Sequence, residues 1–217
     1  MKYSKGCLFL ATALLLFLYA GSLQAALMSY TDYSSFMTDL PGSANVLDFD
    51  SMSNGTIIAN GDTVDGITFT YDFDGIEMMV TGYNELGTND SAVFQDGDDF
   101  SLSFASSNAI GMYFISGDDM EDSDITLTAG GDFVDLSVSS GVDLGEGWYA
   151  YFLGIIDTDN SFTEAWITTI GEGAFLYTVD DIITTSADAA ATPEPTSILL
   201  LGIGLVGMAG FRLRNKR

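Results

Sequence analysis

Along most of the chain, apolar and polar residues alternate with a period of two, which is the pattern of half-buried β-strands. Six segments carry it on these apolar residues: Leu47 and Phe49; Ile67, Phe69 and Tyr71; Ile76, Met78 and Val80; Phe100, Leu102 and Phe104; Val134, Leu136 and Val138; Phe175, Tyr177 and Val179. Turn dipeptides such as Asn54-Gly55 separate such segments about every 10 residues. Two denser apolar segments, Ala109 to Ile115 and Trp148 to Ile156, indicate central strands that are buried on both faces.

One short segment, Tyr33 to Leu40, instead has the apolar spacing of an amphipathic helix. Asp32 precedes it as a capping residue, and Pro41 follows it as a residue that cannot continue a helix. The rest of the pattern gives about eight to ten strands in roughly 165 residues, which is typical of a sandwich with frequent turns. We therefore expect an all-β fold: an antiparallel β-sandwich of jelly-roll type with one short helix.

The first residues have the composition of a secretory signal peptide. Two lysines precede an apolar run from Leu8 to Tyr19, and small residues follow, with Ala25 or Ala26 before the expected cut. The run is shorter than the roughly 20 residues of a spanning helix, which favours a cleaved signal peptide over an uncleaved anchor. Removal of residues 1–25 also removes Cys7, the one cysteine of the chain. The mature chain then has no thiol for a disulfide or a metal ion.

The C-terminal segment has three parts in a fixed order. A Pro-Glu-Pro-Thr motif comes first, an apolar run follows, and basic residues close the chain. In order, these parts are Pro193, Glu194, Pro195 and Thr196; Ile198 to Phe211; and Arg212, Arg214, Lys216 and Arg217. As a helix, the apolar part spans about 24 Å, so it would cross the membrane upright, with the basic residues as a stop-transfer signal at the interface.

This order of motif, apolar helix and basic tail resembles the PEP-CTERM sorting signal of Gram-negative bacteria, a segment also labelled ice-binding protein C-terminal domain. The resemblance implies sorting by an exosortase, a membrane cysteine protease expected to cut near the motif, after export by the secretion machinery. It also implies an association with exopolysaccharide and biofilm matrix. On this basis the chain divides into a signal peptide (1–25), an acidic β-sandwich domain (26–185), a linker (186–192) and the sorting signal (193–217).

The distribution of charge excludes several classes of function. The chain has 31 acidic and 6 basic residues and no histidine, which gives a formal net charge of −25. All six basic residues lie at the ends, so Leu27 to Gly210 contains no cationic side chain. Nucleic acid is excluded as a partner, because phosphate binding needs lysine or arginine. Most catalytic groups are also missing, and no carboxylate pair is marked as that of a glycosidase, so we expect no enzymatic activity.

Several acidic residues are close enough in sequence to attract a cation. They form three sets: Asp96, Asp98 and Asp99; Asp118, Asp119, Glu121, Asp122 and Asp124; and Asp180 with Asp181, joined by Asp48 and Asp50 from the other end of the domain. Because only oxygen ligands are available, the ion would be Ca²⁺ rather than zinc or copper. The alternative is an acidic surface that is solvated without a bound ion.

Short Asp-and-aromatic segments, such as Leu47 to Asp50 and Tyr177 to Ile182, resemble those of secreted bacterial β-sandwiches, including carbohydrate-binding modules. Trp148 and Trp166, with Tyr149 and Tyr151, are the candidates for stacking on sugar rings. The strand spacing of Trp148 to Ile156 favours core packing for most of them. We expect an exported, non-enzymatic surface or extracellular-matrix protein. A Ca²⁺-dependent carbohydrate-binding module is the alternative.

Overall fold

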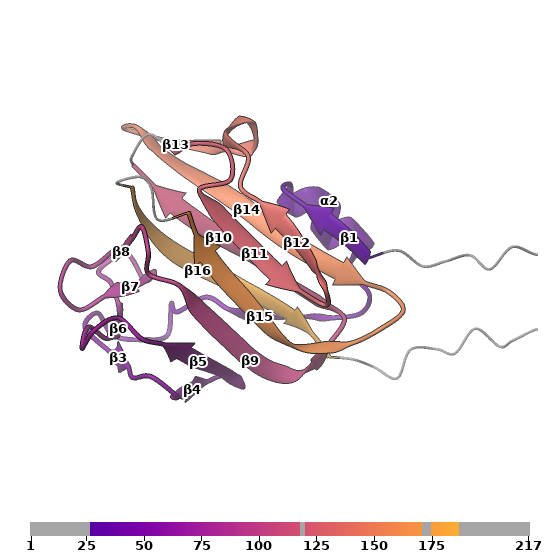
Figure 1. Ribbon diagram of the computed structural model, residues 1–217, viewed down its shortest axis with the longest axis horizontal. Helices are drawn as coiled ribbons and strands as arrows, with labels where there is room; N and C mark the ends of the chain where they lie inside the picture. Colours follow the sequence, from indigo (N-terminus) through magenta and orange to yellow (C-terminus); the bar gives the residue numbers. More distant parts are fainter. Residues whose placement is uncertain (1–26, 118–119, 171–174, 187–217) are drawn as a thin grey trace, which may run out of the picture.

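The computed structural model describes residues 27–117, 120–170 and 175–186, which form two antiparallel β-sheets and one short α-helix (Figure 1). The predicted all-β sandwich is therefore confirmed. The predicted signal peptide and C-terminal helix lie outside the described residues. Within those residues, no helix is long and apolar enough to cross a membrane.

The larger sheet has ten strands built around three long ones, β10 (Ala109–Ser116), β14 (Trp148–Asp157) and β16 (Leu176–Thr185). β10 lies between the other two, as its dense apolar sequence predicts. Shorter strands complete the sheet: β1 (Leu27–Tyr30), β2 (Ala44–Leu47), β3 (Ile57–Ile58), β6 (Met78–Val80), β7 (Leu86–Thr88), β8 (Phe94–Gln95) and β13 (Val142–Gly145).

The smaller sheet has six strands, and two of them, β5 and β9, follow the predicted alternation. Its order is β12 (Asp132–Asp135), β11 (Ile125–Ala129), β15 (Phe162–Thr169), β9 (Phe100–Ser107), β5 (Ile67–Tyr71) and β4 (Thr63–Val64). The chain passes repeatedly between the two sheets, from β9 to β10 to β11 and again from β14 to β15 to β16. Four strands of the larger sheet are thus ordered β2-β16-β10-β14, and four of the smaller sheet β9-β15-β11-β12.

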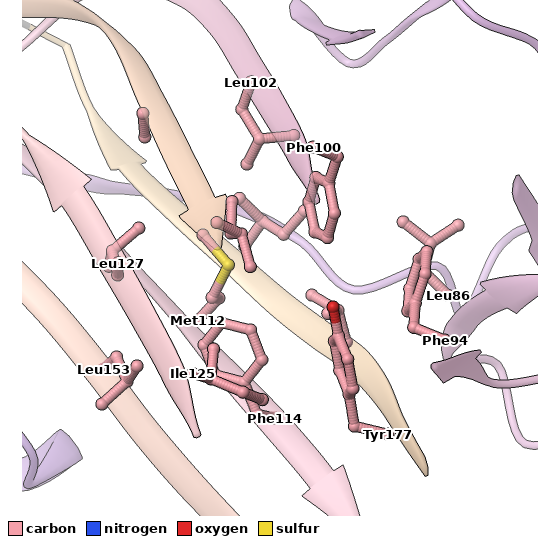
Figure 2. Packing of buried hydrophobic residues seen from close by; sticks show 14 of the residues in the cluster. Leu86, Phe94, Phe100, Leu102, Met112, Phe114, Ile125, Leu127, Leu153 and Tyr177 are labelled. Atoms are coloured by element: carbon pink, nitrogen blue, oxygen red, sulfur yellow. The ribbon is translucent and has the colours of Figure 1, made fainter. Parts of the chain in front are cut away.

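One large apolar core fills the space between the sheets (Figure 2). Phe94 stacks on Phe100 with ring centroids 5.3 Å apart and on Tyr177 with centroids 5.2 Å apart. The Tyr177 ring is fully buried, and its hydroxyl donates a hydrogen bond to the backbone oxygen of Asp98 at 3.2 Å. The core therefore holds a tyrosine whose polar end is satisfied by a loop carbonyl, as buried hydroxyls require.

The predicted helix is present as α2 (Tyr33–Asp39), and the Asp32 side chain caps it by accepting a hydrogen bond from the Ser35 amide at 2.8 Å. The helix lies on the outer face of the larger sheet, where its one fully buried residue, Phe36, meets two glycines. Gly111 of β10 and Gly154 of β14 are cross-strand neighbours, and a Cβ on Gly154 would come within 2.6 Å of the Phe36 ring. The glycine pair thus makes the space that the helix anchor occupies.

Five positions with the predicted strand period lie outside the strands. Two of them, Leu136 and Phe175, directly flank β12 and β16 and are buried. Phe49 follows β2 with a φ of 54°, yet its side chain is fully buried. Val138 begins a short 3₁₀ turn (Val138–Ser140) and is exposed, and Ile76 makes only an isolated bridge with Phe73. At these positions apolar spacing continues past the point where the chain turns, because burial does not require strand geometry.

Both ends of the described domain lie at one end of the sandwich. Leu27 pairs with Asp157 at the end of β14, and Thr185 pairs with Ala44. Trp148 begins β14 at the opposite end. Ten strand residues at about 3.3 Å each put Trp148 roughly 30 Å from Leu27 and Thr185.

Candidate functional site

A groove of about 500 Å³ lies on the outer face of the larger sheet, at the end away from Leu27 and Thr185. Its floor contains Ile115 of β10 and Thr178 of β16, which are paired neighbours. The β13–β14 hairpin forms one wall and contributes Leu144, Glu146 and Trp148. The opposite wall consists of the turn before β7 and the loop after it: Thr81, Gly82, Tyr83, Glu85, Ala92 and Val93. We call this feature the Trp148 groove.

Glycines position the Trp148 side chain. The hairpin turns at Gly145, Glu146 and Gly147, all of which have positive φ angles. A Cβ on Gly117 would lie 3.1 Å from Cε2 of Trp148 and 3.2 to 3.3 Å from Cδ2 and Cζ2. Cε2 and Cδ2 are the two carbons shared by the indole rings. An atom that is nearest to both of them must lie over the face of the indole and not at its edge. One face of the indole therefore lies on the backbone of Gly117, while 44% of the side chain is exposed.

The opposite wall is held by a loop that folds back on its own strand. A Cβ on Gly87 would collide with the carbonyl oxygen of Ala92, so only glycine lets this loop approach β7. The Ala92 amide donates to the Thr88 carbonyl oxygen at 2.9 Å, and the buried Thr88 hydroxyl lies 2.7 Å from the carbonyl oxygen of Val93. Tyr83 extends from the neighbouring turn with 85% of its surface exposed.

The charged groups of the groove are both carboxylates. Glu85 is partly buried and accepts a hydrogen bond from the Thr178 hydroxyl at 2.6 Å, and Glu146 lies on the exposed hairpin. The described ranges of the chain contain no lysine, arginine or histidine. Every charge near the groove that comes from these ranges is therefore negative.

A set of acidic residues lies beside the groove, where β2, β7 and β16 meet. The register of β16 against β10 shifts near Asp181, which has a φ of 50°. Burial, together with the negative charges of Asp181, Glu85 and Asp50, raises the pKa of Asp180 to about 7, although a hydrogen bond from the Asp181 amide acts in the opposite direction. Burial also raises the pKa of Asp181, with added repulsion from Asp48 and Asp50. The structure thus brings together the four acids that the sequence places at opposite ends of the domain.

The other predicted acids are hydrogen-bond acceptors for loop amides. Asp98 accepts from the Gln95 amide at 2.7 Å, and Asp99 accepts from the Thr169 amide at 2.8 Å. Asp122 accepts from Val138 at 2.8 Å, and the buried Asp124 accepts from Glu121 at 2.6 Å. The amide of Asp96 donates to the Phe175 carbonyl oxygen at 3.3 Å. Asp98 and Asp124 thus fix local turns, as carboxylates commonly do in loops, whereas Asp99 and Asp122 link segments that are distant in the sequence.

Among the described residues, no three acidic side chains are grouped as metal ligands. Asp118 and Asp119 lie outside those residues. Calcium binding therefore stays a prediction.

The two predicted stacking tryptophans lie on different sheets. Trp166 is on the outer face of the smaller sheet between Thr128 and Ser101, with 49% of its side chain exposed. Tyr151 is buried in the core, so the core interpretation is right for Tyr151, but it is wrong for Trp148 and Tyr149, which are both exposed. The two tryptophans cannot act on one sugar ring, because Trp148 lines the Trp148 groove and Trp166 lines a separate hollow of about 370 Å³.

Sequence reasoning missed Tyr83, Glu85, Leu144 and Glu146 as groove residues. Tyr83 and Glu85 lie in and beside a turn with no apolar period, and the hairpin pair follows about sixty residues later. The one local signal was the Gly145-Glu146-Gly147 turn directly before an exposed tryptophan. Only the sheet order, which places β7 and β13 on either side of β16, β10 and β14, brings the two walls together.

Comparison with known proteins gives one finding at the C-terminus. Residues 191–216 match the family described as PEP-CTERM protein-sorting motif. This confirms the resemblance read from the Pro-Glu-Pro, the apolar run and the basic tail, while the ice-binding label has no support in it. No match was found among curated proteins or among solved structures. The chain therefore carries a PEP-CTERM sorting motif behind an acidic, antiparallel β-sandwich domain.

Proposed function

We propose that the protein is an exported, non-enzymatic component of the cell surface or extracellular matrix, sorted by an exosortase and associated with exopolysaccharide. The sorting motif at residues 191–216 is the observation that carries this proposal. It implies export, a precursor held in the membrane, and a surface or extracellular fate. The absence of basic residues and cysteine between Leu27 and Gly210 supports a non-enzymatic role, because most nucleophiles and general bases are missing.

The architecture of the domain supports a structural or binding role. Its strand orders, β2-β16-β10-β14 and β9-β15-β11-β12, are those of two interlocked Greek keys and support the jelly-roll type that the sequence predicts. A high negative charge keeps copies of the protein apart and soluble in a crowded matrix.

We expect the mature product to lack Ile198 to Arg217, because an exosortase would cut near Pro-Glu-Pro and remove the apolar helix and basic tail. Intact-mass analysis of protein from the native host measures this. Replacing Pro193, Glu194 and Pro195 by alanine provides the matched control, and this variant should keep its tail. Recovery of the extracellular form with the tail still attached would contradict the sorting proposal.

A second candidate function is that of a Ca²⁺-dependent carbohydrate-binding module. The exposed indole of Trp148 above a groove favours it. The calcium part rests on the dense acids and on the absence of balancing bases between residues 27 and 210.

If calcium fills a site, millimolar CaCl₂ will raise the melting temperature more than NaCl of equal ionic strength. A ligand that binds only the folded state stabilises it by mass action, whereas NaCl only screens repulsion. Replacing Asp98 and Asp99 by asparagine, set against the same change at Asp122 and Asp124, identifies the set that coordinates. Equal stabilisation by both salts would mean that the acids form a solvated surface.

A further inference from the structure

We infer that the Trp148 groove binds a saccharide without anionic groups, which stacks on Trp148 and donates hydroxyl hydrogen bonds to Glu85 and Glu146. The inference deepens the proposed function, and it rests on that function only for the source of the ligand, a neutral polysaccharide at the cell surface. Binding itself depends on the groove alone.

The indole is arranged as a stacking surface. One of its faces lies on the backbone of Gly117, so the exposed part of the side chain is the other face and the edges. Support by a rigid backbone fixes the ring before a ligand arrives, which reduces the entropy lost on binding. An exposed aromatic face suits the C–H face of a sugar ring, because the ligand keeps its hydroxyls directed outward.

The groove combines apolar surface with a few polar groups, as ligand sites do. Ile115 and Leu144 supply apolar surface, and Thr178 lies on the floor between Ile115 and the Glu85 carboxylate. A volume of about 500 Å³ is within the usual range for sites of small ligands. Such a lining matches a ligand that has both an apolar face and a ring of hydroxyl donors.

The negative charge of the groove favours neutral saccharides over anionic ones. Glu85 and Glu146 line the groove, and Asp180 is close enough to Glu85 for their charges to interact. No cationic side chain is present in the described ranges to pair with a uronate or a sulfate. An anionic sugar would therefore be repelled, whereas a neutral sugar can donate its hydroxyl protons to the same carboxylates in strong, charge-assisted hydrogen bonds.

The test uses the full chain in a detergent without a sugar headgroup, so that the result does not depend on processing. Affinity electrophoresis through gels containing dextran, galactomannan or a soluble β-glucan measures binding to neutral polysaccharides. Carboxymethylated forms of the same three polymers provide the charge control. We expect retardation by at least one neutral polymer and none by its carboxymethylated form.

Two tryptophan variants locate the site. Trp148→Ala should weaken binding by about tenfold or more, the usual loss for a buried aromatic anchor. Trp166→Ala is the matched control, because it removes an equally exposed tryptophan from the other sheet and should bind like the parent. Gly117→Val should also weaken binding while keeping Trp148, because the added side chain displaces the ring. Unchanged melting temperatures would show that the variants are folded.

The double variant Glu85→Gln with Glu146→Gln tests the charge argument, and it should bind the carboxymethylated polymers better than the parent does. No retardation by any neutral polymer, or equal binding of both charge forms by the parent, would overturn the inference. So would parental binding by Trp148→Ala. A failure of binding would not change the mass expected for the processed protein. A failure of sorting would not change saccharide binding by the full chain. The two proposals are therefore tested independently.

Discussion

Replacing Phe36 by alanine will lower the free energy of unfolding by about 3 to 5 kcal/mol, the usual cost of deleting a buried phenylalanine. Phe36 is the only fully buried residue of α2 and contacts Phe152, with ring centroids 5.0 Å apart. Gly111 and Gly154, which lie under the Phe36 ring, have no side chains that could fill the empty space. Chemical denaturation with an unchanged m-value measures the loss.

The matched control is Phe133→Ala, on the outer face of β12, where 58% of the side chain is exposed. It should change stability by less than about 0.5 kcal/mol. Gly154→Ala tests the same contact by filling the space under the ring. The added Cβ would overlap the Phe36 ring and lower the free energy of unfolding by about 1 to 3 kcal/mol. If Phe36→Ala and Phe133→Ala cost the same, the helix is not anchored as described.

Acidification from pH 8 to pH 5 will raise the melting temperature, which is opposite to the usual effect of acid on carboxylates. The pKa of Asp180 is about 7 in the folded protein, against 3.8 for an ordinary aspartate, because burial disfavours its charged form. Between these values the folded state binds more protons than the unfolded state, so stability falls as pH rises from about 4 to about 7. The gain between pH 8 and pH 5 is about 1 kcal/mol, roughly half the linkage value over this range, because solvent screens the partly exposed carboxyl.

Asp180→Asn should stabilise the protein at pH 8 and flatten its pH dependence, because the amide never carries the charge. Asp90 is the opposite control: hydrogen bonds from Thr88 and Ser91 lower its pKa, so Asp90→Asn should destabilise the protein at pH 8. Thermal melts of the three proteins at pH 5 and pH 8 measure both effects. An Asp180→Asn protein with the parental pH profile would show that another group is responsible.

The strands that sequence predicted best are those with a simple pattern. β5 and β9 alternate cleanly, and β10 and β14 are dense enough in apolar residues to be recognised as central. β15 was missed because the exposed Trp166 lies between the buried Ala165 and Ile167, which hides the alternation. β11 does alternate, with threonines facing outward, but it is short and follows an acidic loop.

The candidate site was only partly predictable. Trp148 was a candidate because aromatic side chains can stack on sugar rings, but the opposite wall of the groove comes from residues about sixty positions earlier. The meeting of Asp48 and Asp50 with Asp180 and Asp181 depends on the pairing of Leu47 with Ile182, which joins β2 to the last strand, β16. Such pairings depend on the order of the strands in the sheet, and the alternation of apolar and polar residues within one strand does not specify that order.

The direction of β16 has a mechanical consequence. A load applied between a ligand in the Trp148 groove and the last described residue pulls nearly parallel to this strand. β16 is paired on one side with β10 and on the other with β8, β7 and β2. Such a pull shears many backbone hydrogen bonds together instead of opening them one at a time. The domain is therefore strongest along the line that joins its groove to its C-terminal end.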